Sequence, residues 1–234
     1  MLHHLQPLID RAMTRSFTAG STILYQGEVP RHAYIIAKGV VKVMNISPQG
    51  DEQIVMYHVS GEPFPSSWIF GKTAAALFFY EAVKDTTVTL LERDEMIDYM
   101  TAQPERARSI LDYFTTNYSA SLIHVNALEQ SKARDKLLHL LFFLCQRYGV
   151  TRFQKVNIPF ALTHQNIASL VGLTRETTAT EMSRLKKEKV LTYRQQHYVV
   201  DLDRLIALIG EESLKNLHIN VKNPPSGTSG SAAA

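Results

Sequence analysis

The stretch that decides the fold is residues 162–185, which read LTHQNIASLVGLTRETTATEMSRL. Thr163 stands directly before an apolar-periodic run and suits the N-cap of a first helix. Gly172 allows a sharp turn, and Thr174 can cap a second helix. One face of that second helix would point to a core through Thr178, Met182 and Leu185. The pattern predicts a helix-turn-helix.

The residues after this pair of helices predict a wing. Lys186, Lys187 and Lys189 form a basic cluster, and two β-rich runs follow at 190–193 and 198–200. Polar residues 194–197 separate the runs, so we expect a two-stranded hairpin. A helix-turn-helix pattern alone has many false positives, but the β-rich segment, the long helix and the wing, which occur in this order along the chain, together make a chance match remote.

The charge of the 234-residue chain is divided unevenly. Residues 1–131 hold 10 Lys and Arg against 14 Asp and Glu, a net −4, whereas residues 132–234 hold 15 against 8, a net +7. A basic half predicts a polyanionic partner for that half alone, with an ordinary solvated surface as the alternative. Residues 223–234 have the composition of a linker, and we expect them to lie outside the fold.

Composition bounds the remaining possibilities. No run of 18 uncharged apolar residues and no signal-peptide pattern occurs, so we expect no membrane partner and a cytoplasmic protein. The single Cys145 excludes an internal disulfide and a four-cysteine iron–sulfur cluster. The nine histidines show no metal-ligand spacing, and no catalytic constellation is present. We therefore expect neither a metal site nor an enzyme.

Residues 17–91 consist of short β-rich runs separated by turn residues. The runs are 22–25, 33–36, 40–44, 53–57 and 83–91, with glycines at 20, 27, 39, 50 and 61. Strands of this length at about ten-residue spacing predict a sandwich or barrel.

This segment resembles a known family. Residues 19–28 (AGSTILYQGE) and 33–43 (AYIIAKGVVKV) are similar, in order, to the opening of the cyclic-nucleotide-binding β-roll. The resemblance implies a jelly-roll barrel in which Gly27 and Gly39 lie at tight turns.

The ligand that this resemblance implies does not match the residues. Cyclic-nucleotide binders follow a Gly-Glu pair with an arginine that binds the phosphate through two charge-assisted bonds. This chain has the Glu62 counterpart, but no arginine occurs between positions 31 and 93, and Ala76 stands near the expected place. Lys72 and Lys84 are out of frame, and a buried phosphate without a cation is costly. We expect that cyclic AMP is not the effector.

Six aromatic residues stand in the same segment, between positions 64 and 80. One interpretation is that they fill the barrel. The other is a pocket for an apolar or aromatic effector, formed by Phe64, Trp68, Phe79 and Tyr80 with Tyr118 and Ser121 of the following helix.

A long helix is predicted from Pro104 to about Ser131. Apolar and small residues recur at spacings of 3 and 4, at Leu111, Phe114, Tyr118, Ser121, Val125 and Leu128. This is the seam of a two-stranded coiled coil, so we expect dimerisation through Leu111, Phe114, Tyr118, Val125 and Leu128. A seam that faces only its own barrel is the alternative. Residues 131–135 interrupt the pattern and indicate a hinge.

Residues 15–207 together resemble the cyclic-AMP receptor / fumarate–nitrate reductase regulator (Crp/Fnr) family of bacterial transcription factors. The resemblance implies that Arg175 reads guanine and Glu176 reads a cytosine amino group. It also implies phosphate contacts by Thr163, His164, Gln165, Thr174 and Thr177. Thr180 replaces the second arginine of the family motif, and Lys187 adds phosphate attraction.

We expect an α+β chain with three parts: a β-roll sensor at 1–103, a dimerisation helix at 104–131 and a winged helix-turn-helix at 132–222. The function expected is that of a homodimeric regulator that binds a palindromic DNA site and responds to a small effector. RNA polymerase is a candidate further partner. Two alternatives stay open: a family member that needs no ligand, and a small-molecule-binding protein that acts through a protein partner.

Overall fold

The computed structural model describes residues 2–152, 155–211 and 214. The chain forms two compact units, residues 1–116 and residues 117 onward, and the boundary falls inside helix α4 (Pro104–Glu129). The expected linker at 223–234 lies outside the described residues.

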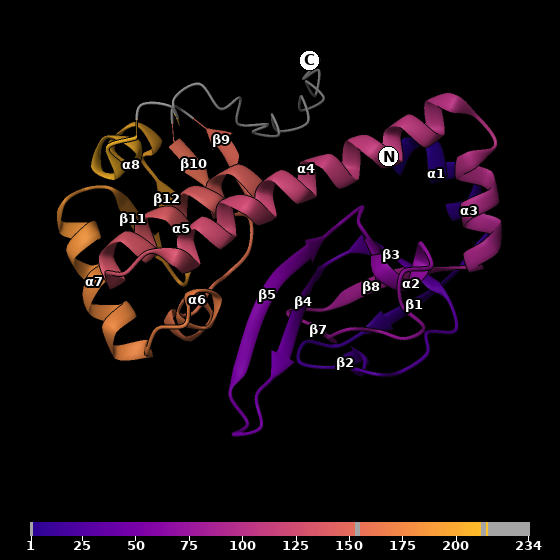
Figure 1. Cartoon of the computed structure of the whole chain (residues 1–234), viewed down its shortest axis with the longest axis horizontal. Helices are drawn as coiled ribbons and strands as arrows, with labels where there is room; N and C mark the ends of the chain where they lie inside the picture. Colours follow the sequence, from indigo (N-terminus) through magenta and orange to yellow (C-terminus); the bar gives the residue numbers. More distant parts are fainter. Residues whose placement is uncertain (1, 153–154, 212–213, 215–234) are drawn as a thin grey trace, which may run out of the picture. The chain divides into compact units, whose positions relative to one another are not determined.

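Unit 1 holds most of the strands (Figure 1). Its elements are α1 (Leu2–Ile9), β1 (Met13–Phe17), β2 (Thr22–Leu24), β3 (Ala33–Lys38), β4 (Val40–Ile46), β5 (Glu52–Val59), β6 (Pro63–Phe64), α2 (Ser66–Ile69), β7 (Phe79–Ala82), β8 (Thr86–Leu91), α3 (Arg93–Thr101) and the first half of α4. The strands form two antiparallel sheets with the orders β1-β8-β3-β6 and β2-β7-β4-β5. This is the expected β-roll.

Strand β3 is buried on both faces, because its alternating side chains serve two cores. Tyr34 and Ile36 pack inside the roll, in a cluster with Leu24, Val41 and Val88. Ala33 and Ile35 pack on the other face against side chains of the helices, namely Leu5, Leu8, Ile69, Met96, Met100 and Ile110. The helices α1 to α3 and the start of α4 therefore cover one sheet of the roll.

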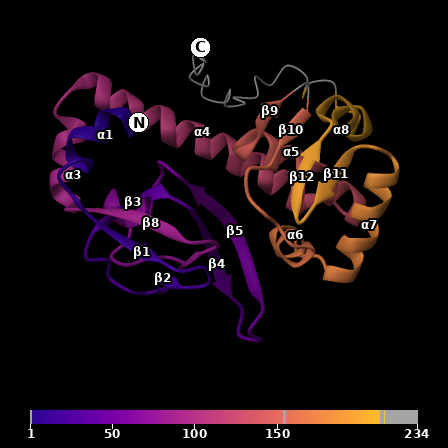
Figure 2. The same cartoon turned by 180° about the vertical axis from the view of Figure 1, so that it is seen from behind.

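Unit 2 contains the second half of α4, then α5 (Ala133–Tyr148), β9 (Val150–Arg152), β10 (Lys155–Asn157), α6 (His164–Val171), α7 (Arg175–Lys187), β11 (Leu191–Arg194), β12 (His197–Val200) and α8 (Leu202–Ile209). Figure 2 shows these elements from behind. The expected break at 131–135 overlaps the gap between α4 and α5, which is residues 130–132, but residues 133–135 already belong to α5.

The sheet of unit 2 is larger than the sequence predicts. Its order is β11-β12-β10-β9, so the expected two-stranded wing is one half of a four-stranded antiparallel sheet. Val156 and Asn157 of β10 pair with Val200 and Val199 of β12. The strands β9 and β10 have only three residues each, too few for an alternating pattern to be recognised.

Gly39 is a glycine for which a side chain has no room. Its φ is +123°, and a Cβ at this position would collide with Thr86 and lie 2.7 Å from the Thr86 Cα. Gly20 also has a positive φ, of +81°, but a Cβ at that position would meet nothing within 4 Å. Substitution of Gly20 therefore tests the cost of the positive φ alone, whereas substitution of Gly39 adds the collision with Thr86.

We predict that Gly39→Ala lowers the free energy of unfolding of unit 1 by about 3 kcal/mol or more, because strain and collision add. Gly20→Ala should cost about 1–2 kcal/mol, from the positive φ alone. Urea unfolding followed by the fluorescence of Trp68, the only tryptophan, measures both. Equal losses at the two positions would contradict the packing described for Gly39.

Candidate nucleic-acid interface

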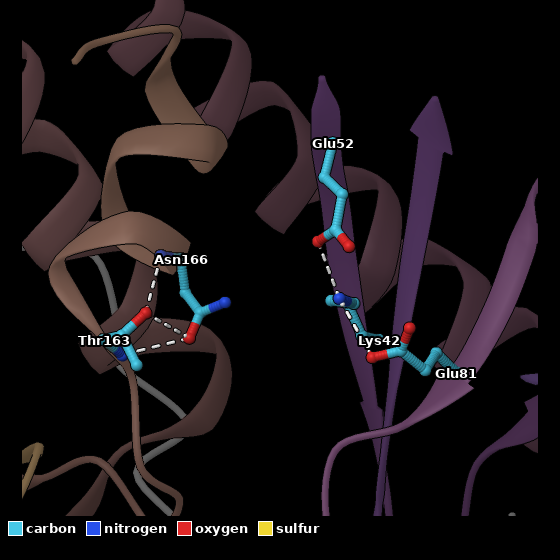
Figure 3. A network of polar contacts seen from close by, with 5 residues as sticks. All are labelled: Lys42, Glu52, Glu81, Thr163 and Asn166. Carbon is cyan, nitrogen blue, oxygen red and sulfur yellow. Dashed lines mark hydrogen bonds and ion pairs between the residues drawn. The ribbon is translucent and has the colours of Figure 1, made fainter. Parts of the chain in front are cut away.

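Helix α6 begins with a reciprocal cap. The Thr163 hydroxyl accepts the backbone N–H of Asn166 at 3.0 Å, and the Asn166 side-chain oxygen accepts the Thr163 backbone N–H at 3.0 Å (Figure 3). This is the geometry of a capping box with asparagine at the third helical position. The cap fixes the direction in which the chain enters α6, and with it the neighbouring His164 and Gln165.

Helix α7 is set by the turn that precedes it. Gly172 ends α6 in the left-handed conformation, and the Thr174 hydroxyl then accepts the backbone N–H of Thr177 at 3.2 Å. The predicted inner face is confirmed, since Thr178, Met182 and Leu185 are fully buried. The predicted contact residues Thr174, Arg175, Glu176, Thr177, Thr180 and Lys187 are all exposed.

The wing ends in a two-residue turn. Arg194 pairs with His197, so Gln195 and Gln196 alone connect β11 to β12. Their φ angles are +48° and +66°, a conformation that two-residue hairpins require and that normally selects glycine or asparagine. Glutamine adopts this conformation less easily than glycine or asparagine, so the backbone of the turn is strained at both residues.

Wing and helices enclose one hollow of about 510 Å³. It is lined by Thr163, His164, Gln165, Arg175, Tyr193, Gln195, Gln196 and Tyr198. The hollow thus brings four of the nine predicted contact residues together with four wing residues that sequence reasoning did not single out. A hairpin pattern identifies the wing but not the side chains that face the helices.

Tyr193 connects the wing to both helices. Its ring meets the His164 ring edge to face at 5.7 Å between centroids. The Lys186 ammonium lies 4.6 Å from the centre of the same ring, within the range of a cation–π contact. These contacts hold the wing against the start of α6 and the end of α7.

The electrostatics of this surface are basic. Burial, and after it the charge of Arg175, lowers the pKa of His164 below its ordinary value, so a neighbouring cation already acts on this imidazole. The last turn of α7 carries Arg184, Lys186 and Lys187, where cations also suit the helix dipole. Anions are the partners that this arrangement favours.

The four predicted effector residues of unit 1 lie in different surroundings within that unit. Phe64 and Tyr80 are buried inside the roll, with their rings stacked at 5.3 Å. Trp68 packs instead against the helical core, under the Arg93 guanidinium. Phe79 is half-buried on the opposite face of β7 from Tyr80. Of the two helix positions, Tyr118 is exposed, and the Ser121 hydroxyl donates to the backbone oxygen of Asn117 in its own helix.

The predicted seam of α4 is largely an exposed apolar row. Its exposed large apolar side chains are Leu111, Tyr118, Leu122, Val125 and Leu128. Phe114 departs from the expectation: it packs against its own unit, edge to face with Phe70 at 4.9 Å. Leu122 is exposed where the spacing pointed to Ser121.

Two further expectations concern the described residues only. None of the helices within the described ranges is long and apolar enough to cross a membrane. In that same part of the chain, no three His, Cys, Asp or Glu side chains gather into a group that could hold a metal ion.

A capped second helix with an exposed polar first turn, beside a wing and a basic helix end, defines a winged helix-turn-helix DNA-binding protein. Comparison with family models agrees with the fold. The cyclic nucleotide-binding domain matches residues 14–103, and the Crp-like helix-turn-helix domain matches residues 135–208. The chain belongs to the Crp/Fnr family of DNA-binding transcriptional regulators and is not an enzyme.

Individual relatives match over most of their length. The nitrogen fixation regulation protein FixK of Rhizobium meliloti is 26% identical over 211 residues, which cover 90% of each chain. The fumarate and nitrate reduction regulatory protein of Vibrio cholerae is 23% identical over 85% of this chain and 78% of its own.

Solved structures share the fold. FixK2 from Bradyrhizobium japonicum has a TM-score of 0.69 at 21% identity, covering 84% of this chain and 96% of its own. CprK in complex with OCPA has a TM-score of 0.64 at 18% identity, covering 87% of this chain and 92% of its own.

Proposed function

We propose that this regulator binds a two-fold symmetric DNA site as a homodimer and that Arg175 and Glu176 read base edges. The observation that carries the proposal is the exposed first turn of α7, which stands at the rim of the hollow shared with the wing. Arginine can bind guanine O6 and N7 with two hydrogen bonds, and glutamate can accept from the cytosine amino group. Half-sites about 34 Å apart would follow from the two-fold symmetry.

The remaining predicted contacts suit the phosphate backbone. They are Thr163, His164, Gln165, Thr174, Thr177 and Lys187, which carry a hydroxyl, an imidazole, an amide or an ammonium group and are exposed or half-buried. Thr180 is also exposed and stands at the position of the family's second arginine, where it bears on the base preference of the half-site. We add Gln195 and Gln196 of the wing, because they line the same hollow as Arg175.

We predict that Arg175→Ala costs roughly 1–3 kcal/mol of operator binding and relaxes the preference for one guanine. Lys187→Ala should weaken binding to all sequences alike and reduce the salt slope by about one, because it removes a phosphate attraction. Binding isotherms on the operator, on single-base variants and on random duplex at several salt concentrations measure both effects. An unchanged base preference in Arg175→Ala would contradict the role proposed for α7.

The same titration tests the alternative from another class, a protein that acts through a protein partner. Binding to random duplex DNA that does not weaken with salt, or no binding at all, would favour that alternative over the DNA-binding proposal. The net charge of +7 on residues 132–234 supports DNA.

We propose that the homodimer forms through the exposed apolar row of α4. Leu111, Tyr118 and Val125 recur every seven residues and are each more than half exposed, which is unusual for large apolar side chains without a partner. Leu128 continues the row, and Leu122 joins it in place of Phe114. A second copy of the same helix supplies the matching apolar surface.

We predict that Tyr118→Glu with Val125→Glu makes the protein monomeric and abolishes operator binding, since like charges would meet at the two-fold axis. Ser119→Glu with Asn126→Glu is the matched control, because it adds the same charges at exposed polar positions of α4. Light scattering gives the mass of each variant. A dimeric Tyr118→Glu, Val125→Glu protein would place the interface elsewhere.

For the β-roll, we propose that any effector is an apolar or aromatic molecule and not cyclic AMP. Four lysines stand between positions 31 and 93: Lys38, Lys72 and Lys84 are exposed, and only Lys42 is buried. The Lys42 ammonium already lies 2.8 Å from a Glu52 oxygen and 3.0 Å from a Glu81 oxygen (Figure 3). Lys42 also alternates along β4 with Val41 and Val43, which belong to the core inside the roll, so its ammonium lies on the other face of the sheet and cannot pair with a phosphate inside the roll.

The carboxylate expected to hold a ribose hydroxyl is engaged as well. Glu62 is buried, lies 3.1 Å from Nδ1 of His58 and accepts the backbone N–H of Val59. The rings of Tyr34, Phe64 and Tyr80 stack in the same cluster at 5.2 and 5.3 Å. This packing supports, as a second candidate, a regulator that needs no ligand. The complex of CprK with OCPA, a protein of the same fold, is in keeping with a small-molecule effector.

We predict that millimolar cyclic AMP leaves both the fluorescence of Trp68 and the operator affinity unchanged, because a phosphate-binding arginine is missing. A panel of aromatic compounds in the same assay separates an effector-responsive protein from a ligand-independent one. A saturable response to cyclic AMP would overturn the proposal.

We further propose that the protein works in the cytoplasm, where RNA polymerase is a candidate partner.

A further inference from the structure

A buried histidine of α4 contacts the helix-turn-helix. His124 is 8% exposed, and its Nε2 lies 2.8 Å from the backbone oxygen of Leu170, in the last turn of α6. Its ring stacks on Phe143 of α5 at 4.6 Å and 14° between planes. The Nε2–H can therefore donate to a carbonyl that no residue of α6 itself satisfies, because the last carbonyls of a helix lack partners within it.

Lys136 of α5 makes a second connection to the same helix end. Its ammonium donates to the backbone oxygen of Leu128 at 2.6 Å and to that of Val171 at 3.4 Å. Leu128 lies in the last turn of α4, and Val171 is the last residue of α6. One cation thus joins the C-terminal ends of two helices, where a positive charge is favoured.

The start of α5 is also connected to α7, the helix that we propose as the DNA recognition helix. The Arg134 guanidinium donates to both carboxylate oxygens of Glu188, the C-cap of α7, at 3.0 and 2.6 Å. This paired hydrogen bond raises the pKa of Arg134 and lowers the pKa of Glu188. The end of α7 is therefore held to the same part of the chain as the end of α6.

The two faces of α4 in unit 2 have different surroundings. Ala120, His124 and Ala127 recur at helical spacing and are buried. Leu122 and Val125, on another face, are exposed. The face that we propose for dimerisation is thus distinct from the face that holds α6.

We infer that His124 and Lys136 are positioning residues that fix the helix-turn-helix to α4, and so set the spacing of the two recognition helices in the dimer. The inference rests on the proposed dimer. A helix-turn-helix dimer binds its operator only when the separation of its two recognition helices matches the spacing of the two half-sites. Without the two links, α6 and α7 would take up a range of orientations relative to α4, and operator binding would have to select one of them.

Double electron–electron resonance, which measures the distance between two spin labels, tests this inference. Ser183→Cys places one label on the exposed face of α7 in each protomer. Because Ser183 shares this face with Thr180 and Lys187, the distances are measured without DNA, and operator affinity is measured in unlabelled proteins that keep Ser183. Cys145 needs no replacement, since it is fully buried and burial raises the pKa of its thiol. We expect a narrow distance distribution in the otherwise unchanged protein.

Two variants remove the links independently: His124→Leu, and Lys136→Met, which keeps the apolar stem. Each should broaden the distribution and lower operator affinity about tenfold, with dimerisation retained. His124→Gln, whose amide can still donate to Leu170, should restore the narrow distribution. His139→Leu is the control for loss of a buried histidine, because the two ring nitrogens of His139 lie against Asp135 and Glu211. Lys132→Met is the control for a lost exposed lysine.

The outcomes are separable. A distribution that stays narrow in both His124→Leu and Lys136→Met, or that broadens equally in the two controls, overturns the role of the links. Absence of any dipolar signal in the protein with Ser183→Cys alone would instead show that the dimer proposal is wrong. Circular dichroism melting of each variant identifies one that has simply unfolded, and the other variant then decides.

Discussion

The orientation of α7 depends on the partners that the backbone groups at the two ends of α6 find. An eight-residue helix is too short to be stable by itself, so its stability comes from packing and from capping. Thr163 and Asn166 satisfy its first N–H groups, and His124 and Lys136 satisfy its last carbonyls. With both ends fixed, the turn at Gly172 can determine only one direction for the helix that follows.

Buried ionisable groups in the β-roll also have polar partners. Lys42 lies between two carboxylates, and His58 lies against Glu62, so these buried ionisable groups have partners of opposite or complementary character. Removing one partner of such a set leaves a buried charge uncompensated, which costs more than the pair contributes.

Much of this architecture could be predicted from local signals. The caps at Thr163 and Thr174 and the turn at Gly172 are properties of single residues, and the long strands β4 and β5 carry clear β-rich runs. The β-rich runs do not predict β1, β6, β7, β9 and β10, which have two to five residues each, because their conformation comes from pairing across the sheet. The predicted run 83–91 covers β8 but not β7. Phe114 shows the limit of periodicity, since spacing assigned it to the seam although Phe70 and Tyr113 surround it.

Helix α4 is the element through which the two parts of the function must be coupled. Ile110 and Phe114 anchor its first half in the helical core of unit 1, and His124 and Ala127 anchor its second half in unit 2. A ligand can shift a conformational equilibrium only by binding one state better than another. An effector in the roll therefore needs to bind more tightly to one of two states of the protein that differ in the position of α4. In a regulator without an effector, the aromatic packing inside the roll would itself have to favour the state that binds DNA. Since α4 is one continuous helix and carries His124, both routes would act on the hydrogen bond between His124 and the Leu170 oxygen.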